Sequence, residues 1–179
     1  MPEQNKSIML VGPPGAGKTS VGGELAKLLG WSFIDVDAVI EQKVSMTVAQ
    51  YFAEFGEPAF RKEERSALET LALERDQLRV IATGGGIMIA PGNFALMQSF
   101  GTVVCLKARV TSLANRLKGD RNRPLLARQE ETAEALETKL ETLLANRESV
   151  YELPEIAIAT DALTPLQVAE KIVSLVGLT

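Results

Sequence analysis

One short motif constrains this chain more than any other feature of its sequence. It reads Gly12-Pro13-Pro14-Gly15-Ala16-Gly17-Lys18-Thr19, after an apolar run and before apolar residues at helical spacing. A glycine-rich turn between a strand and a helix is the context of a P-loop, whose backbone N–H groups cradle phosphates. Lys18 can reach the terminal phosphates, and Thr19 can offer its hydroxyl to Mg²⁺. The sequence therefore predicts a nucleotide site made of Gly12, Gly15, Ala16, Gly17, Lys18 and Thr19.

Composition narrows the class of protein. The chain has 179 residues, the size of one domain, and its 46% hydrophobic content is enough for a full core. A net charge of -4 disfavours nucleic acid or an anionic membrane as the main partner. The sequence contains no apolar run long enough for a membrane span and no signal-peptide pattern at its polar N-terminus. We therefore expect a cytoplasmic protein.

Two residue counts limit the possible mechanism. Cys105 is the single cysteine, so no internal disulfide can form, and it lies in an apolar run that predicts a buried strand. The sequence contains no histidine. A general base must therefore be a carboxylate, a lysine or a water molecule.

Short apolar runs alternate with helical patterns, which predicts an α/β fold with a mainly parallel sheet. The expected strands are residues 7–11, 32–36, 80–83, 102–106 and 155–160. The expected helices are residues 18–29, 48–55, 58–74, 91–100, 110–117, 132–151 and 165–176. Thr164 and Pro165 suit the cap and the first residue of the last helix.

Two carboxylates stand where the second expected strand ends. Asp35 and Asp37 are separated by one residue, so on an extended chain they project to the same side. Ligands bind at the carboxyl ends of strands in open α/β sheets. This placement favours a position for Asp35 on the side of the site where the metal ion binds. It favours contact of Asp37 with a substrate that carries hydroxyl groups. The alternative is loop capping, with Asp37 at the start of the next helix.

The third expected strand runs into three consecutive glycines, Gly84, Gly85 and Gly86. Glycine weakens regular structure, and a turn alone rarely needs three of them. Close approach of the backbone to a ligand would explain the run.

Two arginines share helix faces with leucines. Arg147 follows Leu140, Leu143 and Leu144 at helical spacing, and Arg61 lies seven residues before Leu68. Either guanidinium can extend past the core into water, or it can point into a cleft and bind a carboxylate with its planar fork. The spacing leaves both interpretations open.

Residues 118–124 form a polar segment crowded with cations and interrupted by glycine and proline. One interpretation is a solvated surface loop. The other is a lid whose arginines close over the triphosphate and stabilise charge in the transition state. On the second interpretation, residues 119–128 should gain protection from hydrogen exchange when ligands bind.

The ordered combination of these motifs resembles the shikimate kinases over nearly the whole chain. The match includes the P-loop, Asp35-Val36-Asp37, and Glu57-Pro58-Ala59-Phe60-Arg61. It continues with the three glycines, Arg123-Pro124-Leu125-Leu126, and Asn146-Arg147 followed by Tyr151. Guanine-nucleotide switches are a poor match, because neither Asp-x-x-Gly nor Asn-Lys-x-Asp occurs.

The resemblance implies a three-layer α/β/α P-loop fold of the nucleoside-monophosphate-kinase type, with a five-stranded parallel sheet. It implies transfer of the γ-phosphoryl group of ATP to the 3-hydroxyl of shikimate, with Mg²⁺, on the route to chorismate and the aromatic amino acids. Residues 39–60 would form the substrate-binding segment, and residues 118–128 the lid. We expect a monomer with shikimate and ATP as its partners.

The resemblance also assigns site residues. Shikimate would be held by Asp37, Arg61, Arg147 and the glycines Gly84, Gly85 and Gly86. Lys18, Asp37 and Arg123 would be the catalytic residues, with Arg123 as the lid arginine. Arg116 and Pro165 would lie near the adenine, and Thr19 and Asp35 on the metal side. Family members often carry Asp-Thr-Asn before this proline, where the present chain has Ala159-Thr160-Asp161.

Two alternatives remain at this stage. One is another small-molecule kinase of the same superfamily, acting on gluconate or a nucleoside monophosphate. The other is a non-catalytic ATP-binding regulator, against which the joint presence of Lys18, Thr19, Asp37 and Arg123 argues.

Overall fold

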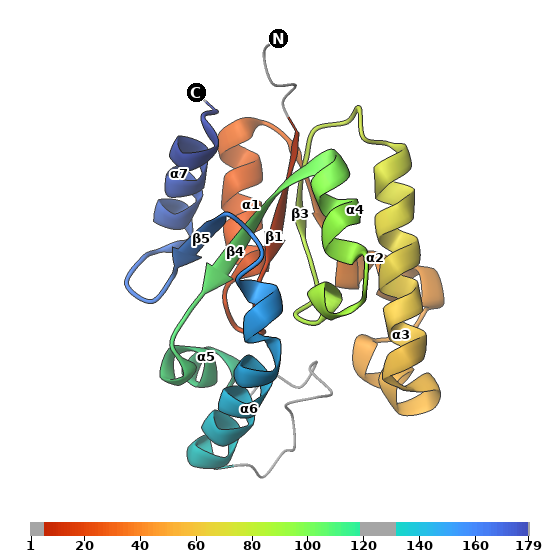
Figure 1. The fold of residues 1–179 in the computed structure, drawn as a ribbon, viewed down its shortest axis with the longest axis vertical. Coiled ribbons are helices and arrows are strands. Elements are labelled where there is room, and N and C mark those ends of the chain that lie inside the picture. The colour runs from red at the N-terminus through yellow and green to blue at the C-terminus, as the bar shows by residue number, and fades with distance from the viewer. Residues whose placement is uncertain (1–5, 119–131, 179) are drawn as a thin grey trace.

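The strands of the described residues form one parallel sheet in the order β2-β3-β1-β4-β5 (Figure 1). The computed structural model describes residues 6–118 and 132–178. The strands are β1 Ser7–Val11, β2 Ser32–Asp35, β3 Arg79–Ala82, β4 Gly101–Lys107 and β5 Ile156–Ala159. Every neighbouring pair is parallel, which confirms the predicted five-stranded parallel sheet.

Helices cover both faces of the sheet, so the predicted three-layer α/β/α fold is confirmed. They are α1 Lys18–Leu29, α2 Val36–Val44, α3 Val48–Leu73, α4 Asn93–Phe100, α5 Val110–Leu117, α6 Ala133–Tyr151 and α7 Pro165–Val176, with a 3-10 turn at Ile87–Ile89. Ile8 and Leu10 of β1 pack in the core with α1 and α7, whereas Met9 and Val11 pack in the core with α3 and α4. This alternation follows from the two-residue period of a strand.

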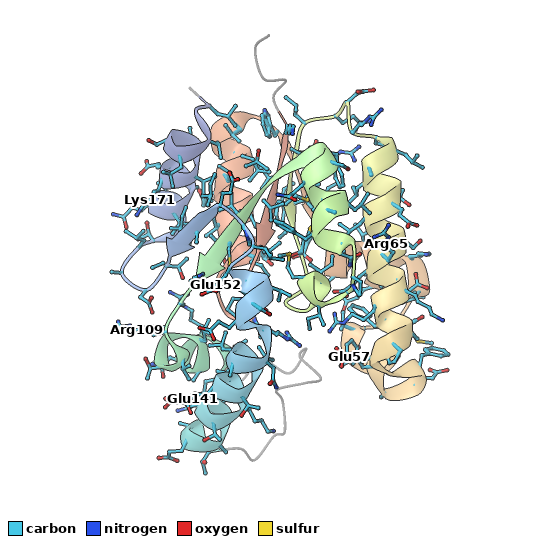
Figure 2. All side chains as sticks on the ribbon, in the orientation of Figure 1. Glu57, Arg65, Arg109, Glu141, Glu152 and Lys171 are labelled. Atoms are coloured by element: carbon cyan, nitrogen blue, oxygen red, sulfur yellow. The ribbon has the colours of Figure 1, made fainter. Side chains whose placement is uncertain are left out.

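Charged side chains lie on the outer faces of the helices. Lys171 on α7 and Glu141 on α6 are exposed and point away from the sheet (Figure 2). Among the helices of the described residues, none combines the length and the apolar character that crossing a membrane requires.

The chain leaves β2 earlier than predicted and enters a helix that the sequence analysis did not predict. Val36 was expected in the strand, but it is the first residue of α2. Asp35 is the N-cap, because its Oδ1 accepts hydrogen bonds from the N–H groups of Asp37, at 3.1 Å, and Ala38, at 3.4 Å. The predicted alternative of a cap at Asp37 is therefore wrong, and Asp37 lies in the first turn of α2. The two carboxylates do not share one side of an extended chain.

Two predicted helices, residues 48–55 and 58–74, are the two halves of the kinked helix α3. Gly56 has non-helical dihedral angles inside α3, with φ 79° and ψ 171°. Pro58 follows, in the first turn of the second half, where a missing N–H costs little. The kink sets the direction of the second half, which carries Arg61 and Glu64.

Part of the predicted lid, residues 119–128, lies outside the described residues, and so does Arg123.

The dihedral angles of Gly56 predict a stability cost for any side chain there. Gly56→Ala should lower the free energy of unfolding by about 1–3 kcal/mol, because that backbone region is almost restricted to glycine. A Cβ at Gly56 would have only an ordinary contact, 3.7 Å from Pro58 Cδ, so the cost comes from backbone strain. Urea denaturation measures it.

Gly23 on α1 is the matched control, because a Cβ there meets nothing within 4 Å and the backbone is helical. Gly23→Ala should raise stability by up to about 1 kcal/mol. Equal effects of the two substitutions would contradict the strained kink.

Candidate active site

A cleft of about 540 Å³ opens at the carboxyl ends of the parallel strands. It is bounded by the loop after β1, the start of α2, the second half of α3, the glycine run after β3, and by α5 and α6. Predicted site residues in its wall are Gly15, Gly17, Lys18, Thr19, Asp35, Asp37, Arg61, Gly84, Gly85, Gly86, Arg116 and Arg147. Gly12, Ala16 and Pro165 are not in the wall. The fold thus brings together residues that are up to 132 positions apart, from Gly15 to Arg147.

The loop after β1 is wound as a P-loop requires. Gly12, Gly15 and Gly17 have φ values of 137°, 81° and 93°, which side chains rarely tolerate. A Cβ at Gly12 would lie 2.2 Å from the carbonyl oxygen of Leu106. The loop ends at Gly17, the N-cap of α1, so the N-terminus of this helix faces the cleft.

Lys18 differs from expectation in its exposure. A lysine that reaches phosphates from a loop could be exposed, but Lys18 is only 6% exposed. Its Nζ donates to the carbonyl oxygens of Gly12 and Pro13, each at 2.9 Å. The loop's own carbonyl groups hold the ammonium group inside the turn that a triphosphate would occupy.

Two side chains whose oxygen atoms could bind a metal ion lie in contact beside the P-loop. Thr19 Oγ1 donates to Asp35 Oδ2 at 2.8 Å. Hydroxyl and carboxylate oxygens suit Mg²⁺, which usually takes one or two protein ligands and completes its shell with phosphate and water. In residues 6–118 and 132–178, no three Cys, Asp or Glu side chains form a metal-binding group. The pair therefore fits a nucleotide-bound Mg²⁺ rather than an ion held by protein alone.

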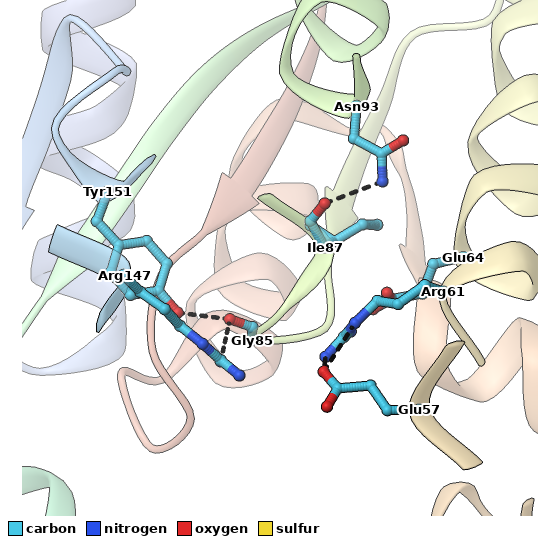
Figure 3. Close-up of polar contacts among 8 residues, drawn as sticks. All are labelled: Glu57, Arg61, Glu64, Gly85, Ile87, Asn93, Arg147 and Tyr151. Carbon is cyan, nitrogen blue, oxygen red and sulfur yellow. Dashed lines mark hydrogen bonds and ion pairs between the residues drawn. The ribbon is translucent and has the colours of Figure 1, made fainter. Parts of the chain in front are cut away.

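Arg61 lines the cleft from the second half of α3 and is held by two carboxylates of its own helix (Figure 3). Its Nη1 donates to Glu64 Oε2 at 2.6 Å. Its Nη2 and Nε donate to Glu57 Oε1, at 2.6 and 3.2 Å. The side chain of Glu64 is fully buried and that of Glu57 is 43% exposed. The alternative of a guanidinium that extends past the core edge into water does not describe Arg61.

Arg147 reaches the glycine run from the other side of the cleft (Figure 3). It is 9% exposed, and its Nη1 donates to the carbonyl oxygen of Gly85 at 2.9 Å. The hydroxyl of Tyr151, one turn further along α6, donates to the same oxygen. Arg61 and Arg147 thus line one cleft from two different helices.

The glycine run has a physical reason that the sequence analysis did not find. A Cβ at Gly84 would lie 2.7 Å from both Asp37 Oδ1 and Glu64 Oε1. A Cβ at Gly86 would lie 2.2 Å from Arg61 Nη2, and one at Gly85 would lie 3.0 Å from Pro14 Cδ. The absence of side chains at these glycines therefore leaves room for Asp37, Glu64 and Arg61, in addition to any ligand that approaches the backbone closely.

Glu64 is the cleft residue that sequence reasoning missed. Burial raises the pKa of its carboxyl to about 7, against the lowering effect of Arg61, and Asp37 raises it further. Its Oε1 is buried and has no hydrogen-bond partner in the described part of the chain. The spacing of Glu57, Arg61 and Glu64, four and three residues apart, was a signal for ion pairs on one helix face.

Arg116 lies at the other end of the cleft, next to the P-loop. Its Nη1 donates to Thr160 Oγ1 at 2.9 Å and to the carbonyl oxygen of Gly15 at 3.3 Å. Pro165 is the first residue of α7, after the predicted cap Thr164, whose side chain accepts from the N–H of Gln167. The loop between β5 and α7 therefore contacts the P-loop through Arg116.

Comparison with known proteins gives consistent matches. A family model described as shikimate kinase matches residues 14–176. A shikimate kinase of Chlorobium chlorochromatii is 42% identical, over 90% of this chain and 86% of its own. A shikimate kinase of Thermodesulfovibrio yellowstonii is 40% identical, over 94% of this chain and 93% of its own. The structure of Acinetobacter baumannii shikimate kinase in complex with shikimate superposes with a TM-score of 0.88 at 38% identity, over 97% of this chain and 94% of that one.

The raised pKa of Glu64 predicts how stability changes with pH. Between the ordinary pKa of 4.5 and about 7, the folded state binds more protons at Glu64 than the unfolded state does. The contribution of Glu64 to stability must therefore fall as the pH rises through this window. Glu64→Gln removes that contribution, so its free energy of unfolding should gain about 2–3 kcal/mol relative to wild type between pH 5 and pH 8.

Urea denaturation at the two pH values measures this difference. Glu57→Gln is the control, because it removes the other carboxylate that binds Arg61 and leaves Glu64 in place, so the loss of stability with rising pH should persist. A pH-independent difference between wild type and Glu64→Gln would show that Glu64 is ionised throughout.

Proposed function

The chain belongs to the shikimate kinase family, and we propose that its cleft binds shikimate between α3 and α6 and ATP at the P-loop. Its activity is the ATP-dependent phosphorylation of shikimate, which gives shikimate 3-phosphate and ADP and belongs to aromatic amino-acid biosynthesis. The observation that carries the site assignment is one cleft shared by a P-loop, Arg61, Arg147 and Asp37.

The acceptor half of the cleft suits a small hydroxylated acid. Arg61 and Arg147 would bind the carboxylate, since a guanidinium fork matches a carboxylate in geometry and charge. Asp37 would orient the attacking 3-hydroxyl and accept its proton, the role that the absence of histidine leaves to a carboxylate. The backbone from Gly84 to Gly86 would form the wall against which the ring lies.

The phosphate half of the cleft suits phosphoryl transfer, which depends on positioning and charge stabilisation. Lys18 and the N-terminus of α1 would bind the β- and γ-phosphates. Thr19 and Asp35 would hold Mg²⁺, which offsets charge on the transferred group when it is bound. Arg116 would lie near the adenine. Arg123 would act from the lid, as the sequence predicts.

Some expectations remain predictions from the sequence. They are the role of residues 39–60 as the substrate-binding segment, the monomeric state and the cytoplasmic location. The described part of residues 39–60 supplies Val48, Phe52 and Phe60 to the cleft wall, which supports the first of them.

The direct test is ADP release measured with a panel of acceptors. Shikimate should support turnover in the presence of Mg²⁺ and ATP, whereas gluconate and AMP should not. Turnover with gluconate or AMP alone would assign the cleft to another kinase of the superfamily. No turnover with any acceptor, despite ATP binding, would favour a non-catalytic regulator.

Lys18→Ala should leave a folded protein with about 100- to 1,000-fold lower turnover, because one preorganised charge on the transferred group is lost. Lys27→Ala is the control on the same helix, since Lys27 is exposed and its ion pair in the described part of the chain is with Glu24. Steady-state kinetics and thermal melting of both variants separate catalysis from folding. Near-normal turnover of Lys18→Ala would remove the P-loop lysine from the mechanism.

Arg61→Lys and Arg147→Lys should each raise the Michaelis constant for shikimate by about 10- to 100-fold and leave that for ATP nearly unchanged. Lysine keeps the charge and loses the planar fork. Arg65→Lys on α3 is the matched control, because Arg65 binds Glu69 and Asn93 away from the cleft. An effect on ATP alone would show that the two arginines do not bind the carboxylate.

A further inference from the structure

Glu64 is a buried carboxyl group that the phosphoryl-transfer reaction does not itself require. It lines the acceptor half of the cleft, and its side chain is 0% exposed. One oxygen, Oε2, accepts from Arg61 Nη1 at 2.6 Å. The other, Oε1, is buried without a hydrogen-bond partner among the described residues. Both Oε1 and Asp37 Oδ1 lie 2.7 Å from the position that a Cβ would take at Gly84. A buried carboxylate oxygen without a partner is costly unless it carries a proton or receives a hydrogen bond.

The charges around Glu64 are nearly balanced before any substrate binds. The charges that act on Glu64 are those of Arg61 on its own helix, Asp37 on α2 and Arg147 on α6. Glu57 binds the same guanidinium group of Arg61. Counted with Glu64, these are three carboxylates against two guanidinium groups. A bound acid adds a fourth negative charge next to the two guanidinium groups that Glu64 depends on for its ionised form. A like charge close by disfavours ionisation of a carboxyl group.

We propose that Glu64 takes up a proton when shikimate binds, so that the affinity for this acid is linked to pH through Glu64. The proposal rests on the proposed function, because it takes the substrate to be an anion held by Arg61 and Arg147. The proton comes from solvent and ends on the Glu64 carboxyl group, whose O–H can then donate to a neighbouring oxygen. No covalent bond of the substrate changes in this step.

The free protein is poised for this uptake near neutral pH. The pKa of Glu64, raised by burial to about 7, means that the carboxyl group is mostly ionised at pH 8 in the empty cleft. The arriving carboxylate competes for Arg61 and displaces water, and both effects raise the pKa further. Binding at pH 8 should therefore take up protons, to a limit of about one per shikimate. Above this pH, the dissociation constant should rise with pH, by at most about tenfold per pH unit.

Calorimetry of shikimate binding to the wild-type protein tests this directly. Titrations at pH 8 in two buffers with different ionisation enthalpies give the number of protons exchanged. We expect net proton uptake, to a limit of about one proton per shikimate, and a dissociation constant that rises from pH 8 to pH 9 by at most about tenfold. Binding with no proton exchange would overturn the proposal, and this result requires no variant.

Two variants identify the residue that takes up the proton. Glu64→Gln should bind shikimate with no proton uptake and with a dissociation constant that does not change from pH 8 to pH 9, whatever its absolute affinity. Glu57→Gln, which also loses a carboxylate bound to Arg61, should keep the uptake. Uptake that persists in Glu64→Gln would overturn the assignment. A residue that only positions Arg61 would change the affinity by the same factor at each pH.

The failure of this proposal can be distinguished from that of the proposed function. If wild-type protein neither binds nor phosphorylates shikimate at pH 7, the proposed function fails and the proton linkage fails with it. If shikimate binds and is phosphorylated but no proton is taken up, only the linkage fails.

Discussion

The acceptor half of the cleft depends on the absence of side chains at Gly84 and Gly86. The carboxylates of Asp37 and Glu64 converge on the first of these residues, and the guanidinium group of Arg61 lies against the second. A methyl group at either position would overlap with these charged groups, at 2.7 and 2.2 Å. The side chains of Asp37, Arg61 and Glu64 can therefore pack against the loop after β3 only because that loop carries no side chains at Gly84 and Gly86. The glycines are required by contacts within the protein, before any ligand is considered.

The ion pair between Arg61 and Glu64 is better explained by function than by stability. Taking both charges out of water costs free energy that their attraction offsets only with good geometry and full hydrogen bonding. Here Glu64 uses one oxygen on Arg61 and leaves the other without a partner in the described residues. Replacement of a buried ion pair by apolar residues of similar volume is often neutral or stabilising in proteins. The pair instead holds the guanidinium fork at the cleft in one orientation, which lowers the ordering cost of binding a carboxylate.

What the sequence predicts well is what local chemistry decides. The P-loop and the helices α1, α5 and α7 depend on residues that are near one another in sequence. These three helices were predicted with their observed bounds. Helix α2 was missed because two backbone hydrogen bonds to Asp35 end the strand, and the apolar pattern continues past that point. The importance of Glu64 was invisible for a different reason. Glu64 lies against Gly84, twenty residues away, on the half of α3 that follows the kink at Gly56.

The P-loop itself is held by more than its own glycines. Flexible glycines give the loop its winding but lose conformational entropy when they are ordered. Thr160, at the end of β5, donates from its hydroxyl to the carbonyl oxygen of Ala16 at 3.3 Å and accepts from Arg116, which also binds the carbonyl oxygen of Gly15. Thr160 is itself tied to β4 through its N–H and the carbonyl oxygen of Lys107, at 2.8 Å. The sheet thus orders the loop through β5 and α5, so that part of this entropy is lost on folding rather than on binding nucleotide.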